Sequence, residues 1–323
     1  MGVPWNLSSP AAQAEAVITP VACNVLGEIA SMKGALGRFA YAADFANLEQ
    51  SAVAGLGRIR RLIVEGRIDP LARVRHSVES VQLPLVEREL RIGIFPTAAN
   101  PFHWAHLLGG LVAMERFLLD KVVFVIAGQD FRKPDMASEE ARHSMARKIL
   151  EMFHPLFEYS SIARGTATSG EENLFRILSL NPAQPIHVFY IAGGDHYHRF
   201  HPMTGNPDTI QKIEDGMNAR LSGLDRRRHR VSAVFLDRED EKGEISTFLD
   251  VHRVGRLAVQ TSSTEIRAAM ENRRRWETLY TLPFAALLSI CSGSLYRVWA
   301  CAELLDEVHP LLGRARAQRS RHV

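Results

Sequence analysis

Residues 91–106 read RIGIFPTAANPFHWAH, and this stretch decides the fold class. It opens with a short, nearly continuous apolar run, 91–95, that ends at Pro96. A strand buried on both faces of a parallel sheet has this texture. A loop follows, and then His103 and His106 stand at the start of a strongly helical pattern. The stretch predicts a buried strand, a loop and a helix in succession.

Apolar runs of the same kind recur along the chain, with helical patterns between them. Strands that alternate with helices build βαβ units. The sequence therefore predicts an α/β fold with a doubly wound, Rossmann-like parallel sheet, which binds its ligand beyond the carboxyl ends of the strands. Further strands are expected at 122–127, 186–192, 231–236 and 256–259, and helices at 105–119, 137–153 and 170–180.

Near Leu90 the sequence changes from helical patterns alone to apolar runs that alternate with helical patterns, and this change predicts three parts of the chain. Residues 1–88 are expected to form an N-terminal helical extension, 89–296 the α/β domain and 297–323 a C-terminal helical tail. Within the extension, residues 1–20 are rich in Ala, Ser and Pro and are expected to be loosely ordered or partly helical. A further helix is expected from Pro70 to about Val81.

The composition is that of an ordinary globular protein, with 46% hydrophobic and 23% charged residues. A formal net charge of +3 is too small to indicate a nucleic-acid partner. The three cysteines lack metal-ligand spacing, and their odd count disfavours a disulfide framework. With neither a signal peptide nor a membrane-spanning run expected, a cytoplasmic location fits best.

The two histidines are candidates for phosphate chemistry. Their spacing of three places both imidazoles on one helix face. The N-terminus of a helix offers free N–H groups and a positive dipole end, which suit a phosphate. Two other interpretations stay open from the residues alone, because such a pair is also half of a metal site or simply a polar helix start.

A second candidate stretch follows the last expected strand, where residues 261–267 read TSSTEIR. Ser262 and Glu265 have the spacing of a capping box, which by itself accounts for the serines. Alternatively, the hydroxyls at this helix start, together with Arg267, grip a polyphosphate.

Two weaker signals follow other strands. Gly193-Gly194-Asp195 comes after the 186–192 run, where glycines allow a ligand to approach closely, although an ordinary strand-to-helix turn is the more common reason for such glycines. Lys133 and Arg142 come after the 122–127 run, and taken alone they read as surface cations.

In combination these segments resemble the nucleotidylyltransferase superfamily, most of all the nicotinamide and nicotinate mononucleotide adenylyltransferases. The first stretch is similar to that family's Asn-Pro-x-His-x-small-His motif, and the second is similar to its Ser-Ser-Thr-x-Ile-Arg signature. Smaller similarities lie in the Lys and Arg-x-x-Met positions, the Gly-x-Asp after a strand and the Leu-Tyr ending. The matching residues are Asn100, Pro101, His103, His106, Lys133, Arg142, Met145, Gly193, Asp195, Ser262, Ser263, Thr264, Ile266, Arg267, Leu295 and Tyr296.

The resemblance implies transfer of AMP from ATP to a mononucleotide, with release of pyrophosphate and with Mg²⁺ entering together with ATP. It implies ATP and a mononucleotide as partners, no nucleic acid and no membrane, and it permits a homo-oligomer. Catalytic roles fall to His103, His106, Lys133 and Arg267. Phosphate contacts fall to these histidines and Arg267 together with Thr97, Ala98, Ser262, Ser263 and Thr264, and nucleoside or acceptor contacts to Asn100, Gly193, Asp195 and Tyr197.

The chain departs from the family pattern at several positions. Pro96-Thr97 stands where the family has Gly-Gly, and Ser169-Gly170 stands where it has an aromatic residue and Thr. The aromatic residues that hold the pyridine ring are therefore missing from their usual places. Tyr197, Phe200 and Trp104 are the nearest candidates to replace them. Tyr197 and Phe200 would share a helix face, on which Phe200 is expected to pack onto the sheet.

These departures leave two alternatives. One is the same chemistry with another acceptor, such as phosphopantetheine or a sugar or alcohol phosphate. The other is a nucleotide-binding regulatory module with weak turnover. A nicotinamide dehydrogenase is disfavoured, because no Gly-x-Gly-x-x-Gly follows a strand.

Overall fold

The computed structural model describes most of the chain from residue 9 to residue 296. The described ranges are 9–36, 42–77, 84–129, 136–219, 225, 227–236, 245–255, 257–271, 278–293 and 295–296. Lys133 and the expected tail at 297–323 lie outside them.

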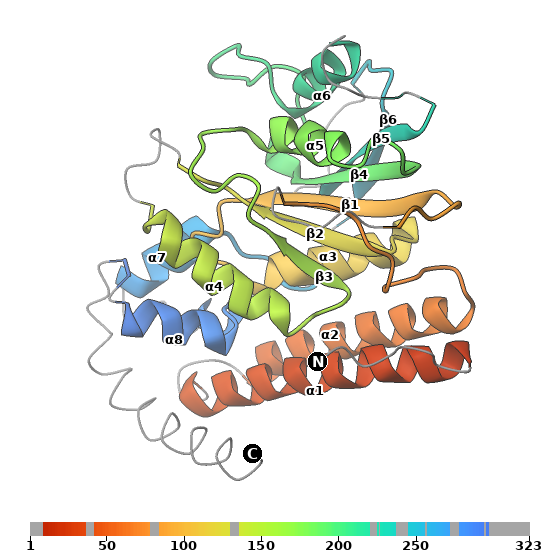
Figure 1. Ribbon diagram of the computed structural model, residues 1–323. Helices are drawn as coiled ribbons and strands as arrows, with labels where there is room; N and C mark the ends of the chain where they lie inside the picture. The colour runs from red at the N-terminus through yellow and green to blue at the C-terminus, as the bar shows by residue number, and fades with distance from the viewer. Residues whose placement is uncertain are drawn as a thin grey trace.

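A six-stranded sheet forms the centre of the molecule, with the strand order β3-β2-β1-β4-β5-β6 (Figure 1). Each neighbouring pair is parallel. β1 and β4 lie side by side at the point where the strand order reverses, which is where doubly wound sheets bind ligands. The strands are β1 (Leu90–Thr97), β2 (Lys121–Ile126), β3 (Phe157–Ser160), β4 (Ile186–Gly193), β5 (His229–Leu236) and β6 (Asp250–Val254).

The predicted α/β class and the four long buried strands are confirmed, whereas the last strand was placed wrongly. β6 ends at Val254, and residues 257–260 are irregular, so the expectation of a strand at 256–259 is wrong. The edge position explains the error, because β6 is only five residues long and mostly half-exposed and therefore lacks a continuous apolar run. β3, at the other edge, is four residues long and was not predicted for the same reason.

Helices cover both faces of the sheet (Figure 1). α5 and α6 pack on one face, where their apolar side chains join those of β1, β4 and β5 in one core cluster. α3, α4, α7 and α8 lie on the other face in a second, larger cluster. Their bounds are α3 (Trp104–Phe117), α4 (Glu139–Glu151), α5 (Gly170–Ser179), α6 (Thr209–Asn218), α7 (Ser263–Glu271) and α8 (Phe284–Ser292).

The N-terminal segment forms two long helices, α1 (Pro10–Leu36) and α2 (Ala42–Val64). They pack on each other and form a layer beneath α3 and α8 (Figure 1). Their buried residues belong to the same core cluster as those of α3, α4, α7 and α8, so the helix pair continues the hydrophobic core rather than enclosing its own. The boundary at residue 88 stays a prediction, although within the described residues the sheet takes no strand from before Leu90.

The helix expected from Pro70 to about Val81 is wrong over residues 70–77, which form a turn and then irregular chain. The rest of that range lies outside the described residues. This segment crosses to the opposite face, where the backbone N–H of Arg75 donates to Oδ1 of Asn181 at 3.0 Å. The Asn181 amide donates in turn to the Arg75 carbonyl at 2.8 Å. A side chain therefore satisfies the backbone groups that a helix would have paired internally.

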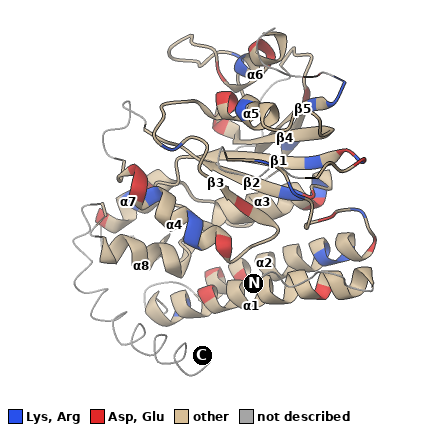
Figure 2. Cartoon of the chain, in the orientation of Figure 1, with Lys and Arg blue, Asp and Glu red and all other residues tan. Residues whose placement is uncertain are grey.

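Basic and acidic side chains are interspersed along the helices, as Figure 2 shows for α2 and α4. Among the described residues, no helix is both long and apolar enough to cross a membrane.

A buried ionic cluster ties the start of β2 to β3 and to the segment before β1. Lys121, which is only 2% exposed, pairs with Glu158, and Nε2 of His76 lies 2.9 Å from the second carboxylate oxygen. Burial alone would raise the pKa of Glu158, but the hydrogen bond and charge of His76 and the charge of Lys121 outweigh it and lower the pKa to about 2.

We expect Glu158 to make stability depend on pH in the acid range. Because its pKa is lower in the folded state, the stabilisation is complete above the unfolded pKa of about 4.5 and is lost as the pH falls toward 2. The loss reaches up to about 3 kcal/mol. Urea unfolding at several pH values should show this slope in the wild type and a much weaker one in Glu158→Gln. Glu140→Gln, at a side chain that is 84% exposed, is the control. An equal slope in Glu158→Gln and wild type would contradict the assignment.

Candidate active site

The two histidines lie at the start of α3, at the carboxyl edge of β1. His103 is the N-cap residue of α3, with extended backbone (φ −146°, ψ 167°), and it is only 2% exposed. The imidazoles of His103 and His106 stack with ring centroids 3.7 Å apart. Phe102 packs against His106 with centroids 5.0 Å apart. The predicted shared face is confirmed, and apolar rings hold the pair in place.

Hydrogen bonds fix which nitrogen of His106 carries the proton. Its Nδ1 accepts from the backbone N–H of His103 at 3.3 Å, so the hydrogen of a neutral ring is on Nε2. Nε2 lies 2.9 Å from Oγ1 of Thr97, which also accepts from the N–H of Ala99 at 3.1 Å. The Thr97 oxygen thus accepts two hydrogens, and its own hydroxyl hydrogen is available to a further acceptor. Thr97 and His106 together present O–H and N–H donors beside the helix start.

Asn100 connects this loop to three other segments. Its Oδ1 accepts from the Tyr296 hydroxyl at 2.7 Å and from the backbone N–H of Ala137 at 3.0 Å, just before α4. Its backbone carbonyl accepts from Nη1 of Arg267 at 2.6 Å. Asn100 is only 4% exposed. The side chain that was expected to contact the acceptor therefore binds the protein itself and shapes the loop.

The second stretch of the sequence lies against the first, although more than 160 residues separate them. Oγ of Ser263 donates to the carbonyl of Pro101 at 3.0 Å, beside the contact of Arg267 with Asn100. Ser262 and Glu265 form the predicted capping box, with the N–H of Glu265 bonding to Oγ of Ser262 at 3.1 Å and the N–H of Ser262 bonding to the Glu265 carboxylate at 2.7 Å. The capping interpretation is confirmed for Ser262, while Ser263 and Arg267 contact the histidine loop and their binding of a polyphosphate stays a prediction.

Thr264 and Ala98 support this arrangement. Oγ1 of Thr264 accepts from Nη2 of Arg267 at 3.2 Å, which orients the guanidinium. The carbonyl of Ala98 accepts from Arg142 at 2.8 Å.

Arg142 is not a surface cation, because it is only 1% exposed. Its guanidinium donates to the backbone carbonyls of Ala98, Ala127, Gly128 and Ala137 at 2.6 to 3.1 Å. It therefore joins the loop after β1, the loop after β2 and the start of α4. Carbonyl oxygens that would otherwise lie unpaired solvate the buried charge.

The residues expected near the acceptor lie after β4, next to the end of β1. Gly193 lets the Asp195 side chain approach the backbone closely, since an added Cβ would lie 2.3 Å from Oδ1 of Asp195 and the carboxylate would have to turn away. The Asp195 side chain is 65% exposed, so it faces the solvent beyond the sheet edge. Gly170 is required nearby, because an added Cβ would lie 2.4 Å from the Tyr190 hydroxyl and 2.7 Å from Pro96. This close contact accounts for Ser169-Gly170, in which Ser169 caps α5.

Two of the three aromatic candidates, Tyr197 and Trp104, have buried rings, whereas Phe200 is exposed. Tyr197 is 6% exposed, packs edge-on against Phe235 with centroids 5.1 Å apart and is covered by the Arg253 guanidinium. Trp104 is 1% exposed and packs against Phe153. The expected shared helix face of Tyr197 and Phe200 is wrong, because residues 197–200 are not helical. Phe200 is 51% exposed instead of packed onto the sheet.

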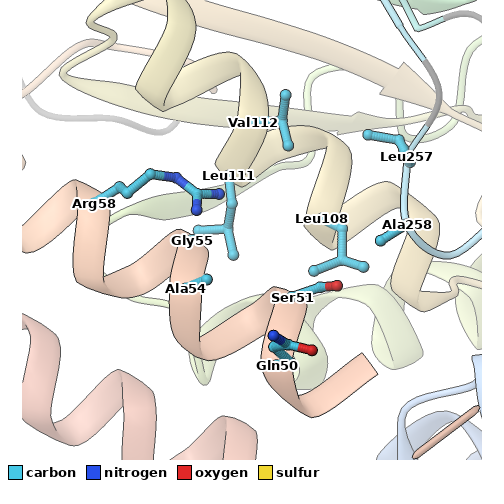
Figure 3. Close-up of a pocket in the computed structure, with 10 residues that line it drawn as sticks. All are labelled: Gln50, Ser51, Ala54, Gly55, Arg58, Leu108, Leu111, Val112, Leu257 and Ala258. Atoms are coloured by element: carbon cyan, nitrogen blue, oxygen red, sulfur yellow. The ribbon is translucent and has the colours of Figure 1, made fainter. Parts of the chain in front are cut away.

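A cavity of about 240 Å³ lies elsewhere, between α2, α3 and the segment before α7 (Figure 3). The imidazole pair, Ser263 and Arg267 do not line it. It is the space left where α2 meets α3, and the chemistry described above lies at the N-terminal end of α3. Its lining consists of Gln50, Ser51, Ala54, Gly55, Arg58, Leu108, Leu111, Val112, Leu257 and Ala258.

Tyr296 is the residue whose role was least visible in the sequence, where it appeared only as part of a Leu-Tyr ending. Burial raises the pKa of its hydroxyl, so the group keeps its proton and donates to Asn100 at neutral pH. Across the described part of the chain, no group of three or more His, Cys, Asp or Glu residues is placed to hold a metal ion.

The chain is similar over about two thirds of its length to curated adenylyltransferases. It is 27% identical over 214 residues to the probable nicotinate-nucleotide adenylyltransferase of Mycolicibacterium vanbaalenii, an alignment that covers 65% of this chain and 94% of the relative. It is 25% identical over 213 residues to that of Desulfitobacterium hafniense, covering 64% of this chain and 96% of the relative. No family model matches the chain.

These relatives are adenylyltransferases, which are nucleotidyltransferase enzymes. The similarity runs over nearly the whole length of each relative, and in this structure the two motifs that resemble the nucleotidylyltransferase family meet at one loop. Among solved structures, Plasmodium falciparum nicotinic acid mononucleotide adenylyltransferase complexed with NaAD aligns over 65% of this chain and 98% of its own, with 13% identity and a TM-score of 0.47.

We expect Arg142→Lys to destabilise the protein by about 3 kcal/mol or more, the scale of breaking a buried charge network. An ammonium group is a single donor centre and cannot reach carbonyls on three segments. Chemical denaturation measures the change. The matched control is Arg147→Lys on the same helix, where the side chain is 68% exposed and pairs with Glu151. Similar small changes in both variants would show that the four carbonyl contacts contribute little.

Proposed function

We propose that this enzyme transfers AMP from ATP to nicotinamide or nicotinate mononucleotide and releases pyrophosphate, a step of NAD biosynthesis. The observation that carries the proposal is the meeting of Ser263 and Arg267 with the loop that leads into the stacked imidazoles of His103 and His106. This arrangement gathers cationic and hydroxyl donors around one helix N-terminus, as binding of a triphosphate requires. The curated relatives, named as nicotinate-nucleotide adenylyltransferases, support the choice of acceptor.

The proposed reaction needs no protein nucleophile. An oxygen of the acceptor's phosphate attacks the α-phosphorus of ATP, the new P–O bond forms, and the bond from the α-phosphorus to the bridging oxygen breaks as pyrophosphate leaves. Catalysis then consists of positioning and charge stabilisation. Mg²⁺ enters as the ATP complex and keeps most of its waters, so no set of protein carboxylates is needed.

Each donor has a part in this proposal. His106 donates from Nε2 to the phosphate that is transferred, exchanging its bond with Thr97 for one with substrate. His103 assists at the same phosphate. Arg267 exchanges the carbonyl of Asn100 for the β- and γ-phosphates, with Lys133 assisting. Thr97 contributes its hydroxyl hydrogen, and Asp195 lies near the nucleoside hydroxyls.

A substrate panel tests the proposal. Purified enzyme with MgATP is given nicotinamide mononucleotide, nicotinate mononucleotide, phosphopantetheine and glycerol phosphate in turn, and pyrophosphate release is measured. Release with either pyridine nucleotide, accompanied by the dinucleotide product, is the expected result. Release only with another acceptor would keep the chemistry and replace the substrate, whereas ATP binding without release would indicate a regulatory module.

We expect His106→Ala to lower kcat by roughly 10²–10³, the effect of removing one transition-state hydrogen-bond donor. The affinity for ATP should change little, because the donor acts where charge develops during transfer. Steady-state kinetics with direct ATP titration separates the two quantities. Wild-type turnover in this variant would remove His106 from the mechanism.

We expect Arg267→Lys to raise the KM for ATP several-fold, because a point charge cannot replace a fork that grips two phosphate oxygens. The control is Arg164→Lys, at a side chain that is 55% exposed and lies between β3 and α5. An unchanged KM in Arg267→Lys would show that Arg267 does not hold the phosphates of ATP and that residues 262–265 only cap α7.

A further inference from the structure

We propose that the helices α1 and α2 act as a brace that sets the geometry of the phosphate loop, residues 97–103, and that Glu28 is a positioning residue within it. The inference rests on the proposed function for its kinetic readout. The brace acts through α8 and Tyr296, which bonds to Asn100 in the loop.

The first step is the contact of α1 with α8. Oε2 of Glu28 accepts from the backbone N–H of Ala285 at 2.8 Å. Ala285 is in the first turn of α8, where backbone N–H groups have no partner inside the helix. The N-cap of α8 is Pro283, which makes no side-chain capping bond. Glu28 therefore supplies the missing cap from 257 positions away, and its negative charge suits the positive end of the helix dipole.

The second step leads from α8 to the loop. The N–H of Leu295 donates to the carbonyl of Ile290 at 3.0 Å, which fastens the chain after α8 to its last turn. The next residue is Tyr296, whose hydroxyl donates to Oδ1 of Asn100 at 2.7 Å. A shift of α8 along its axis would thus move the Tyr296 hydroxyl relative to the loop.

Two other helices, α3 and α4, also meet the phosphate loop at their N-terminal ends and contact the α1–α2 pair near their C-terminal ends. α3 presents its N-terminus there and α4 presents Ala137 just before its first turn. Arg58 of α2 bonds to Glu115, near the C-terminal end of α3, at 2.6 Å. Asn24 of α1 donates to the carbonyl of Met152, at the C-terminal end of α4, at 3.3 Å.

Three helices thus meet the phosphate loop at one end and the α1–α2 pair at the other. When a rigid helix shifts at one end, its other end shifts too. A small displacement of catalytic groups lowers the reaction rate strongly. The alignment that covers 94% of the Mycolicibacterium vanbaalenii relative covers only 65% of this chain, so about a third of the chain has no counterpart there.

The test uses the full-length enzyme with Glu28→Ala, Glu28→Gln, Tyr296→Phe and the double variant Glu28→Ala/Tyr296→Phe. The matched control is Glu15→Ala, a carboxylate on the same helix that bonds to Thr19 and Arg60 and not to α8. Glu28→Ala should lower kcat roughly tenfold, within the range for a small displacement of catalytic groups, with the KM for ATP changed less than twofold. Glu28→Gln keeps an acceptor oxygen and should recover most of the rate. Glu15→Ala should have wild-type kinetics.

The double variant separates positioning from general destabilisation. If Glu28 acts through Tyr296, the double variant should be hardly slower than the slower single variant, whereas independent effects would multiply. Amide hydrogen exchange of residues 97–103 should rise in Glu28→Ala and stay unchanged in Glu15→Ala.

Multiplying effects, or a wild-type kcat and wild-type loop exchange in a folded Glu28→Ala, would overturn the brace. A wild-type enzyme that releases no pyrophosphate with any acceptor would instead overturn the proposed function. The exchange comparison and the ATP dissociation constant would then decide on the brace without turnover.

Discussion

The hydrogen bonds of Asn100 are the constraint on which the rest of the site depends. A buried amide oxygen must be satisfied, and here Tyr296 and the start of α4 satisfy it together. The carbonyl of the same residue receives Arg267 from α7. One position thereby fixes the relative places of β1, α4, α7 and the end of α8. The imidazole pair follows three residues later and inherits that geometry. Arg142 stabilises the same arrangement by donating to the carbonyls of Ala98 and Ala127.

Apolar rings surround the polar groups of the site and help to orient them. His106 sits between Phe102 and Phe95, so its orientation comes from packing, while its proton position comes from His103 and Thr97. Arg267 and His106 each have a protein partner, the Asn100 carbonyl and Thr97. In the proposed reaction these partners hold the donors in the orientation that a triphosphate needs, which reduces the reorganisation required for transfer.

Much of the fold could be predicted because β1, β2, β4 and β5 are buried on both faces and read as continuous apolar runs. The edge strands β3 and β6 are short and partly exposed, so hydrophobic pattern alone did not place them. The histidines, Ser263 and Arg267 were found from motif spacing. The partners of Asn100 and Arg142 were not, because contacts between residues far apart in sequence leave no local pattern. The packing of Tyr197 could not be predicted for the same reason, because only the fold shows that Phe235 and Arg253 cover its ring.

In the proposed function the Asn100 loop and α7 jointly hold a triphosphate. A crystal structure with Mg²⁺, a non-hydrolysable ATP analogue and a pyridine mononucleotide tests this most directly. We expect phosphate oxygens within hydrogen-bond distance of Nε2 of His106 and of the Arg267 guanidinium, with the bonds to Thr97 and to the Asn100 carbonyl exchanged for them, while Tyr296 stays on Asn100. A nucleotide bound elsewhere, or bound while both protein bonds persist, would contradict it.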